Sequence, residues 1–589
     1  MDCNLKIYNI NYINRAFSYM VDLYNYDKLV TLNNVYKNTL IQCNENDKVS
    51  ELIKTKLFPH QLKLVQNMDR YRERMTHGFI HEMKAIHSKI GIICDPSGTG
   101  KTLSVLSYIA STIDYHFPMI TNNLSENSSK YFFSHDLHHF SDASSSNLII
   151  VPHHLFGQWK DEIENHTKLK YLPIETKRVI KETDTAEKII KSHIVLTTNT
   201  CYKYVEEYAV KNNIQWKNVI IDEASSIYLQ SSDPSLRFEF LWLVTQNWLP
   251  LLFKHSNMDI VQMSRFKTSI ELHPECEKWL NNHLTVSYDQ TCNVSPFLKE
   301  YLPYFHPQRW YMFLRNSSID IEQSISLYSP IEHIIQCRPN VTINSLSSIY
   351  LARNAEPIIK SSQIPQLYQA LGVEFKSISK YIEEQPITKS QLIQRKVNEK
   401  ECSICLDKPE YTTIVNCCYN IYCGKCLLRN TLIYHRCPTC REGVNITNMC
   451  CLDPLLDSQK ISNKNKMEMC LDLLRENKNG KFIIHSTFNN IYYQLFEEID
   501  KLGLKAERIE NNLFSLLKTI KNFKEGSTQI LFVSNIDAIR GLSLSSISHL
   551  IFYHEQPSYE WRQLLIHSAQ RMQRMQPLKI LHLHSEIQV

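Results

Sequence analysis

A phosphate-binding loop is indicated by residues 95–102, which end in Gly-Lys-Thr. A short apolar run, 90–94, precedes this segment, and an amphipathic, helix-like stretch follows it. In that layout the backbone N–H groups of the turn and of the helix N-terminus converge on phosphate oxygens. Lys101 would reach the β- and γ-phosphates of a nucleoside triphosphate, and Thr102 would hold Mg²⁺. The residues predicted to bind the nucleotide here are Asp95, Pro96, Ser97, Gly98, Thr99, Gly100, Lys101 and Thr102.

An acidic pair, Asp222 and Glu223, ends a later apolar run, 219–222. Asp222 would orient Mg²⁺, and Glu223 would polarise the attacking water. An acidic pair at the end of a strand is common by chance, but a phosphate-binding loop upstream makes chance a poor explanation. The two segments together favour hydrolysis of a nucleoside triphosphate.

A cluster of cysteines could carry a second kind of chemistry, because eight of the 18 cysteines lie between residues 402 and 440. Three pairs have the spacing Cys-x2-Cys, which places two thiolates at the separation that tetrahedral zinc requires. A disulfide framework would instead need a small secreted chain. The pattern therefore predicts zinc, with the candidate ligands Cys402, Cys405, Cys417, Cys418, Cys423, Cys426, Cys437 and Cys440.

Short apolar runs alternate with helical stretches on both sides of the cysteine cluster, which is typical of parallel sheets covered by helices. Between roughly 250 and 400 the pattern indicates long mixed helices without strand alternation. The sequence therefore predicts an α/β protein in which two lobes flank a helical insertion and a small zinc module. The strand-like runs are 90–94, 148–151, 194–197 and 219–222 in the first lobe and 482–485, 530–533, 549–553 and 580–583 in the second.

The composition excludes several classes of protein. The chain has 589 residues, which is too many for one hydrophobic core, so two to four domains are expected. Only 12 residues are glycine, which excludes collagen-like and glycine-linker chains. A net charge of +5 neither requires nor excludes nucleic acid as a partner. No apolar run is long enough to cross a membrane and no signal pattern opens the chain, so we expect a reducing, intracellular location without a membrane partner.

The chain resembles the Swi/Snf-type ATPases of helicase superfamily two over roughly residues 50–250 and 465–589. The resemblance implies two RecA-like lobes, ATP and Mg²⁺ as ligands, and double-stranded DNA as a partner that stimulates hydrolysis. It also implies that Gln61 meets adenine and that Arg571 and Arg574 reach across the cleft as arginine fingers. The segments that carry the resemblance are 57–61, 148–152, 157–163, 222–225, 482–488, 540–544 and 570–574.

Some positions depart from the family's pattern. The third motif, close to Ser/Thr-Gly-Thr-Pro in the family, is replaced by residues 245–247, Thr-Gln-Asn, and His567 stands where a glutamine is usual. Because the third motif couples hydrolysis to movement in the family, this departure bears on coupling rather than on hydrolysis. Family members grip the phosphate backbone with polar side chains, for which the candidates at strand ends are Thr197, Thr198, Asn199, Ser486 and Thr487.

The cysteine cluster resembles a RING finger, in which two zinc ions are bound in a crossed arrangement. The family has a histidine at the position of Asn420, and asparagine is a poor zinc ligand. Cys417, a water molecule or, less favourably, His435 would complete the second site. The first site would comprise Cys402, Cys405, Cys423 and Cys426, and the second Cys418, Cys437, Cys440 and that fourth ligand.

RING fingers that act as ubiquitin ligases dock a ubiquitin-conjugating enzyme through a shallow apolar patch. The matching positions are Ile404, Leu427 and Pro438, and Arg441 matches a basic residue that contacts both the enzyme and ubiquitin. A RING between two motor lobes is the layout of the Swi/Snf branch that includes helicase-like transcription factor, and a large-DNA-virus relative is an equal alternative.

The sequence thus predicts a DNA-stimulated ATPase and translocase with a RING zinc finger and ubiquitin-ligase activity. Two alternatives stay open: a non-motor DNA-binding scaffold, and a viral early-transcription ATPase whose zinc module contacts a polymerase. The expected location is the nucleus for a cellular protein, and the cytoplasm or virion for one from a cytoplasmic DNA virus. The expected domains are a region of unknown role (1–50), the first lobe (51–252), the helical insertion (253–398), the RING finger (399–446) and the second lobe (447–589).

Overall fold

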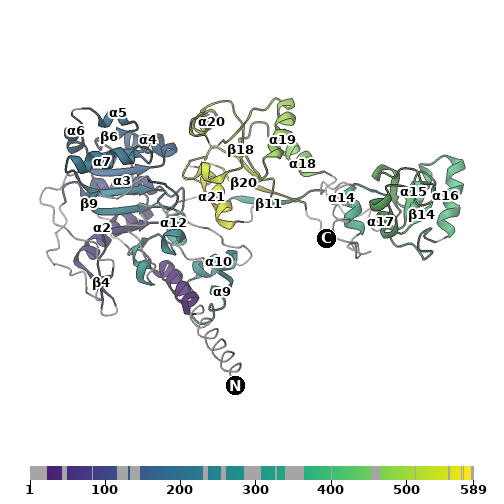
Figure 1. Cartoon of the computed structure of the whole chain (residues 1–589), viewed down its shortest axis with the longest axis horizontal. Coiled ribbons are helices and arrows are strands. Elements are labelled where there is room, and N and C mark those ends of the chain that lie inside the picture. Colours follow the sequence, from purple (N-terminus) through teal and green to yellow (C-terminus); the bar gives the residue numbers. More distant parts are fainter. Residues whose placement is uncertain are drawn as a thin grey trace, which may run out of the picture.

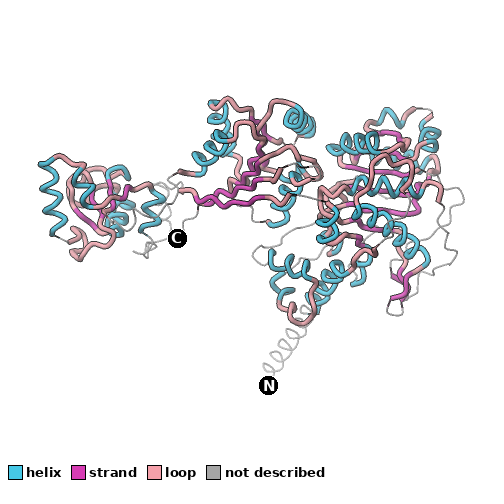
Figure 2. The backbone as a smooth tube through the Cα atoms, turned by 180° about the vertical axis from the view of Figure 1, so that it is seen from behind, coloured by secondary structure: helices cyan, strands magenta, loops and turns pink. Residues whose placement is uncertain are grey.

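The computed structural model arranges the chain as three bodies in a row, with the cysteine-rich module beyond the second lobe (Figures 1 and 2). Among the described residues, no helix is both long and apolar enough to span a bilayer. The structure describes residues 23–42, 49–81, 84–115, 131–132, 146–182, 184–229, 236–253, 260–283, 307–325, 328–338, 364–399, 401–452, 464–510, 512–554, 558–571, 574 and 576–585.

The first lobe is built on a seven-stranded sheet in the order β10-β3-β9-β8-β5-β7-β6, in which every pairing is parallel. Strands β3, β5, β7 and β8 are buried along their whole length. A strand covered on both faces needs a near-continuous apolar run, which is why these strands stand out in the sequence. The strands are β3 (Ile90–Ile93), β5 (Asn147–Val151), β6 (Tyr171–Ile174), β7 (Ile194–Thr198), β8 (Gln215–Asp222), β9 (Arg237–Val244) and β10 (Phe313–Leu314).

Helices cover both faces of this sheet, each over its own apolar cluster. Helices α2 (Pro59–His77), α3 (Lys101–Thr112) and α4 (Phe156–His166) pack on one face. The other face is covered by α7 (Tyr202–Lys211) and, among others, by a helix over residues 23–37. The remaining elements are α5 (Lys177–Ile180), α6 (Thr185–Lys191), α8 (Leu249–Leu252), η1 (His153–Leu155) and a small sheet of β1 (Phe79–His81), β2 (Lys84–Ile86) and β4 (Tyr131–Phe132).

The segment after α8 is not only helical where the structure describes it. Strand β10 returns to pair with β3 at the edge of the first sheet. Strand β11 (Ile331–Gln336) pairs with the last strand of the second lobe. One stretch of chain therefore belongs to the sheets of both lobes. Among the described residues, the helical elements between α8 and the second of these strands are α9 (Ile260–Ser264), α10 (Pro274–His283), η2 (Pro307–Met312) and α12 (Ser318–Ser324).

The second lobe carries a six-stranded sheet in the order β11-β20-β19-β16-β18-β17, again with parallel pairings throughout. Two sheets of this kind, each with helices on its faces, confirm the predicted pair of α/β lobes. The further elements are β16 (Phe482–His485), β17 (Ala506–Arg508), β18 (Ile530–Val533), β19 (His549–Phe552), β20 (Lys579–His584), α18 (Lys466–Glu476), α19 (Asn490–Lys501), α20 (Leu513–Glu525), α21 (Tyr559–Ala569) and η5 (Ile536–Ile539).

The third body holds the cysteine cluster around a small sheet in the order β12-β15-β13-β14. Its apolar clusters contain only residues between 364 and 452, so the module has a core of its own. The elements are α14 (Ile364–Leu371), β12 (Glu374–Phe375), α15 (Ile378–Glu383), α16 (Ile387–Glu399), β13 (Thr413–Val415), β14 (Ile421–Tyr422), α17 (Gly424–Tyr434), η4 (Ile446–Asn448) and β15 (Met449–Cys451).

Candidate nucleotide site and metal centres

The phosphate-binding loop lies between β3 and α3, as the sequence pattern predicts. Gly98 and Gly100 have φ values of 85° and 79°, in the left-handed region that residues other than glycine avoid. A Cβ on Gly98 would also lie 2.8 Å from the carbonyl oxygen of Gln570, in the second lobe. Glycine is therefore required there both by the turn and by the close approach of the other lobe.

Lys101, the first residue of α3, folds back over the loop. Its Nζ donates to the carbonyl oxygens of Asp95 at 2.8 Å and Pro96 at 2.9 Å. Burial lowers the pKa of this ammonium group, and the carboxylates of Glu223 and Asp95 oppose that shift. The cation is thus held at the loop, where it can exchange carbonyl oxygens for phosphate oxygens.

The acidic pair at the end of β8 faces the loop. The Asp222 carboxylate accepts hydrogen bonds from the Glu223 backbone N–H at 2.9 Å and from Trp159 Nε1 at 2.7 Å. Trp159 belongs to the Gly-Gln-Trp block on α4, so this block fixes the orientation of the carboxylate. Burial, followed by the neighbouring Asp222, raises the pKa of Glu223 to about 7. A carboxyl group with a pKa near neutrality suits a proton acceptor for water.

The second lobe brings Arg571 against the phosphate loop. A Cβ on Gly98 would lie 2.9 Å from the Arg571 Cδ atom, and the guanidinium donates to the Leu542 carbonyl at 2.8 Å. Burial lowers the pKa of Arg571 to about 10, while Glu223 raises it. This arginine therefore lies across the interface from the loop, next to the acidic pair.

Arg574 lies elsewhere. Its guanidinium donates to the carbonyl oxygens of Ile547 and Gln576, both at 2.7 Å, within the second lobe. Both arginines thus donate to carbonyls of their own lobe, but Arg571 also lies against the phosphate loop beside the acidic pair, whereas the bonds of Arg574 stay within the second lobe.

Two residues of the second lobe that the sequence reasoning did not assign also lie at the site. Arg540 interacts electrostatically with Glu223, and its carbonyl oxygen accepts a hydrogen bond from His154 at 3.0 Å. His567 is close to Lys101 and Arg571, and burial followed by these cations lowers its pKa to about 4. The imidazole of His567 is therefore neutral and adds no further positive charge beside Lys101 and Arg571. Only a three-dimensional structure could place these side chains, because they come from separate motifs of the other lobe.

A cavity of about 380 Å³ borders the loop between the lobes. Its walls combine aromatic rings with cationic and amide groups, which suits a polar organic ligand. The wall includes Pro96 and Cys94 from the loop region, Gln246 and Trp248 from the end of the first sheet, and Arg540, Tyr559, Trp561 and His567 from the second lobe.

Gln61 is buried beside the loop. Its side-chain oxygen accepts from the Phe58 backbone N–H at 2.9 Å, and its Nε2 donates to the Gly100 carbonyl at 3.2 Å. The side chain is thus fixed on the loop backbone. The replaced third motif keeps one link to the acidic box, because the hydroxyls of Ser225 and Thr245 lie 2.9 Å apart.

The polar residues at the strand ends differ in accessibility. Thr197 and Thr198 are fully buried, and their hydroxyls bond the Ile174 carbonyl and Thr200 respectively. Ser486 is also buried. These three have local partners, which leaves the partly exposed Asn199 and the exposed Thr487 as the strand-end residues with accessible side chains.

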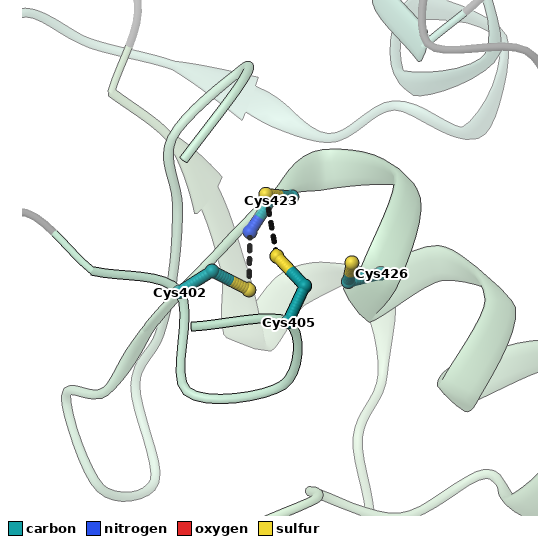
Figure 3. Close-up of side chains that lie close together, drawn as sticks. All are labelled: Cys402, Cys405, Cys423 and Cys426. Atoms are coloured by element: carbon teal, nitrogen blue, oxygen red, sulfur yellow. Dashed lines mark hydrogen bonds between the residues drawn. The ribbon is translucent and has the colours of Figure 1, made fainter. Parts of the chain in front are cut away.

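The cysteine sulfurs gather in two groups of four. Within each group the sulfur atoms lie within 4.8 Å of one another, which fits a tetrahedral ion with thiolate ligands. Cys402 also accepts the Cys423 backbone N–H at 3.2 Å, a bond that favours thiolate (Figure 3). The groups are Cys402, Cys405, Cys423 and Cys426, and Cys417, Cys418, Cys437 and Cys440.

The two groups alternate along the chain, so the module has the crossed arrangement that the spacing suggested. Cys417 supplies the fourth sulfur of the second group. His435 ends α17 with a φ of 53° and lies outside both groups, as does Asn420.

The four residues predicted to dock a conjugating enzyme are not equally accessible. Ile404 is 40% exposed and Arg441 is exposed, whereas Pro438 is half-buried. Leu427 has no exposed surface and packs in the core of the module. Leu406, two residues further along the chain, is 72% exposed and was not assigned from the sequence.

Comparisons with known proteins place these features in context. Residues 14–249 match the model of the SNF2-related domain. A protein of Acanthamoeba polyphaga mimivirus named as a helicase is 22% identical over 605 residues, which cover 84% of this chain and 68% of that protein. Subunit slx8 of the slx8-rfp E3 ubiquitin-protein ligase complex of Schizosaccharomyces pombe is 33% identical over 84 residues, 13% of this chain and 31% of that one. The Sulfolobus solfataricus SWI2/SNF2 ATPase core, solved with double-stranded DNA, is 15% identical, with coverages of 92% and 90% and a TM-score of 0.28.

Proposed function

The chain is a Swi/Snf-type, helicase-like ATPase of superfamily two, and from this premise we propose that it hydrolyses ATP under stimulation by double-stranded DNA and translocates along the duplex. The observation that carries the proposal is the convergence of Lys101, the pair Asp222 and Glu223, and Arg571 at the interface of the lobes. Hydrolysis would then depend on how the lobes meet, which is the property that a DNA-driven motor requires.

Each of these residues has a distinct task in the proposed reaction. Lys101 exchanges its carbonyl partners for the β- and γ-phosphates, and the loop N–H groups hold the remaining oxygens. Thr102 and Asp222 would hold Mg²⁺, which neutralises phosphate charge when bound. Glu223 orients and deprotonates the attacking water. Arg571 stabilises the charge that develops on the transferred phosphoryl group, a contribution worth roughly 10³–10⁵ in rate for an arginine finger.

The test is ATP turnover measured with duplex DNA, single-stranded DNA and RNA in parallel. We expect duplex DNA to give the largest stimulation and Lys101→Ala to abolish turnover. Lys211→Ala, at an exposed position of α7, is the matched control and should keep full activity. Equal turnover with and without every nucleic acid would contradict the proposal.

For the cysteine-rich module we propose two bound zinc ions and ubiquitin-ligase activity. The four-sulfur groups support the metal, and the exposed apolar surface of Ile404 and Leu406 supports a docking role. The similarity to a subunit named as part of a ubiquitin-ligase complex points the same way. A reducing, intracellular location, also proposed, would keep the thiols available as ligands.

Self-ubiquitination with a panel of conjugating enzymes tests the ligase activity. We expect chains to form with at least one enzyme and Ile404→Ala to prevent this. Ile387→Ala, at an 81% exposed position of α16, serves as the control for removal of an exposed isoleucine. No activity with any enzyme, in protein that contains two zinc ions, would leave the module with a purely structural or protein-binding role.

A further inference from the structure

The start of the phosphate loop is held by a residue far away in the sequence. The Asp95 carboxylate accepts two hydrogen bonds from Asn316, one from its backbone N–H and one from its Nδ2, both at 2.7 Å. Asn316 has no exposed surface and Asp95 is 1% exposed. Because the carbonyl of Asp95 is also a partner of Lys101, Asn316 fixes the residue on which the catalytic lysine rests.

The end of the loop is held from the same segment through an imidazole relay. His60 Nε2 lies 2.8 Å from the Thr99 carbonyl, and His60 Nδ1 lies 2.7 Å from the hydroxyl of Ser324 on α12. A carbonyl only accepts, so Nε2 carries the proton and Nδ1 accepts from the serine. One short segment therefore holds the loop at two points, at Asp95 through Asn316 and at Thr99 through Ser324 and His60.

That segment, residues 315–325, is itself firmly attached to the first lobe; we refer to it as the brace. Ser317 caps α12 by accepting the Asp320 backbone N–H at 3.1 Å, and the Asp320 carboxylate accepts from Ser317 in return. Asp320 also pairs with Lys63 on α2 at 3.0 Å. The helix is too short to be stable alone, so these caps and the ion pair fix its position.

The chain beyond the brace reaches the second lobe within a few residues. The Tyr328 carbonyl accepts a hydrogen bond from the side chain of Gln570, the residue before Arg571. Strand β11 then pairs with β20 along its whole length. The brace and Tyr328, three residues beyond its end, therefore contact the phosphate loop and the residue that precedes the proposed arginine finger.

We propose that Asn316 and Ser324 are positioning residues for the phosphate loop, and that the brace holds the loop in the form that binds nucleotide. The inference deepens the proposed ATPase function and rests on it. The contact joins Asp95 to a position 221 residues away in the sequence. It predicts that nucleotide affinity, rather than global stability, depends on this contact.

The experiment exchanges the two partners. In Asn316→Ala the amide donor is lost, and in Asn316→Asp two carboxylates face each other across a buried contact. Both variants should bind a fluorescent ATP analogue at least about tenfold more weakly, the effect of losing one hydrogen bond to a charged group. The double exchange Asp95→Asn with Asn316→Asp restores one donor and one acceptor pair, and affinity should recover to within about threefold of the original.

Binding of the analogue and the melting temperature are measured for every variant, together with KM and kcat. Glu322→Ala, an exposed position of α12, is the control and should change none of them. The inference would be overturned if Asn316→Ala bound the ATP analogue as tightly as the original protein. It would also be overturned if the double variant stayed folded but did not recover affinity for the analogue. Because binding is measured without turnover, an inactive parent protein would refute the ATPase proposal and still leave the brace testable.

Discussion

At the scale of single residues, Glu223 combines a proposed catalytic role with an environment that disfavours its ionised form. Its backbone has a φ of 50° although it is not glycine, and burial beside Asp222 raises its pKa from 4.5 to about 7. Between these two pH values the folded protein binds more protons than the unfolded chain. The free energy of unfolding therefore falls as pH rises through this window, and the cost of the ionised carboxylate is complete above it.

Replacing this carboxyl with an amide should remove that cost. Glu223→Gln is expected to abolish ATP turnover and to raise the melting temperature by roughly a few degrees at pH 8. At pH 5 the two proteins should melt at nearly the same temperature, because Glu223 is protonated in the folded state. Thermal scans at both pH values check this, with the exposed Glu207→Gln as the control. If the melting temperatures of Glu223→Gln and the original protein differed by the same amount at pH 5 and at pH 8, the raised pKa of Glu223 would be contradicted.

The two arginines of the last motif should separate in their effects. Arg571→Ala is expected to lower kcat for ATP by roughly 10³-fold or more, because Arg571 lies against the phosphate loop and its cation interacts with Glu223 and Asp222. Arg574→Ala should leave kcat within about threefold and instead lower the free energy of unfolding by about 1–3 kcal/mol, because backbone carbonyls lose their donor. Steady-state kinetics and urea unfolding of the two variants provide the comparison. A similar loss of kcat in both would show that Arg574 reaches the nucleotide when the lobes close.

Residue spacing was sufficient to predict the position of the loop between β3 and α3, the acidic pair at the end of β8 and the two groups of four cysteine sulfurs, because each rests on a local geometric requirement. It could not distinguish Arg571 from Arg574, since both lie in one short motif and differ only in what surrounds them. Asn316 carried no sequence signal at all. Its role depends on a contact with Asp95, and a single asparagine in a helical region has no pattern to mark it.

At the scale of elements, a buried lysine contacts the C-terminus of α3, the helix that follows the phosphate loop. Lys217, on β8, donates to the carbonyl oxygens of Ile113 at 3.0 Å and Tyr115 at 2.8 Å, and also to that of Thr112. The Thr112 carbonyl ends α3 and also accepts the Tyr115 backbone N–H at 3.2 Å, and the carbonyls of Ile113 and Tyr115 follow directly after the helix. Carbonyl groups at a helix C-terminus need partners from outside the helix, and Lys217 supplies one. Burial lowers the pKa of Lys217 to about 8, so the ammonium is retained at neutral pH.

Lys217→Met keeps the length of this side chain and removes its donors. We expect the free energy of unfolding to fall by about 1–3 kcal/mol, because buried carbonyl oxygens at the end of α3 lose a charged partner. Urea unfolding followed by tryptophan fluorescence measures the change. The exposed Lys211→Met should have almost no effect. An unchanged midpoint in Lys217→Met would mean that water replaces the ammonium group at no cost.

The elements that the sequence revealed are those buried on both faces. The apolar runs at 148–151 and 219–222 lie within β5 and β8, whose residues are all buried. Strand β10 has two residues, too few for any periodicity. Strand β11 lies at a sheet edge with most of its residues exposed, so no buried face imposes an apolar pattern on it. The connection between the lobes was consequently hidden in a region that looked wholly helical.

At the scale of the whole molecule, the three bodies are coupled to different degrees. One apolar cluster contains residues of both lobes, including Leu155 from the first and Leu542 from the second. The clusters of the cysteine-rich module contain no residue of either lobe, and the module lies beyond the second lobe in the structure (Figure 1). The two lobes should therefore unfold cooperatively, whereas the cysteine-rich module should unfold in a separate transition.

Loss of the first sulfur group tests this separation. Cys402→Ser removes a ligand from a site whose metal would supply much of the folding free energy of so small a module. We expect rapid amide hydrogen exchange and proteolysis confined to residues 401–452, one zinc ion fewer per chain, and DNA-stimulated ATP turnover within about twofold of the original. Cys201→Ser, at a buried cysteine of the first lobe outside both sulfur groups, is the control for the substitution itself. A loss of ATP turnover in Cys402→Ser that parallels the loss of hydrogen-exchange protection in residues 401–452 would contradict this expectation. It would mean that the folded module contacts the lobes and helps them to close.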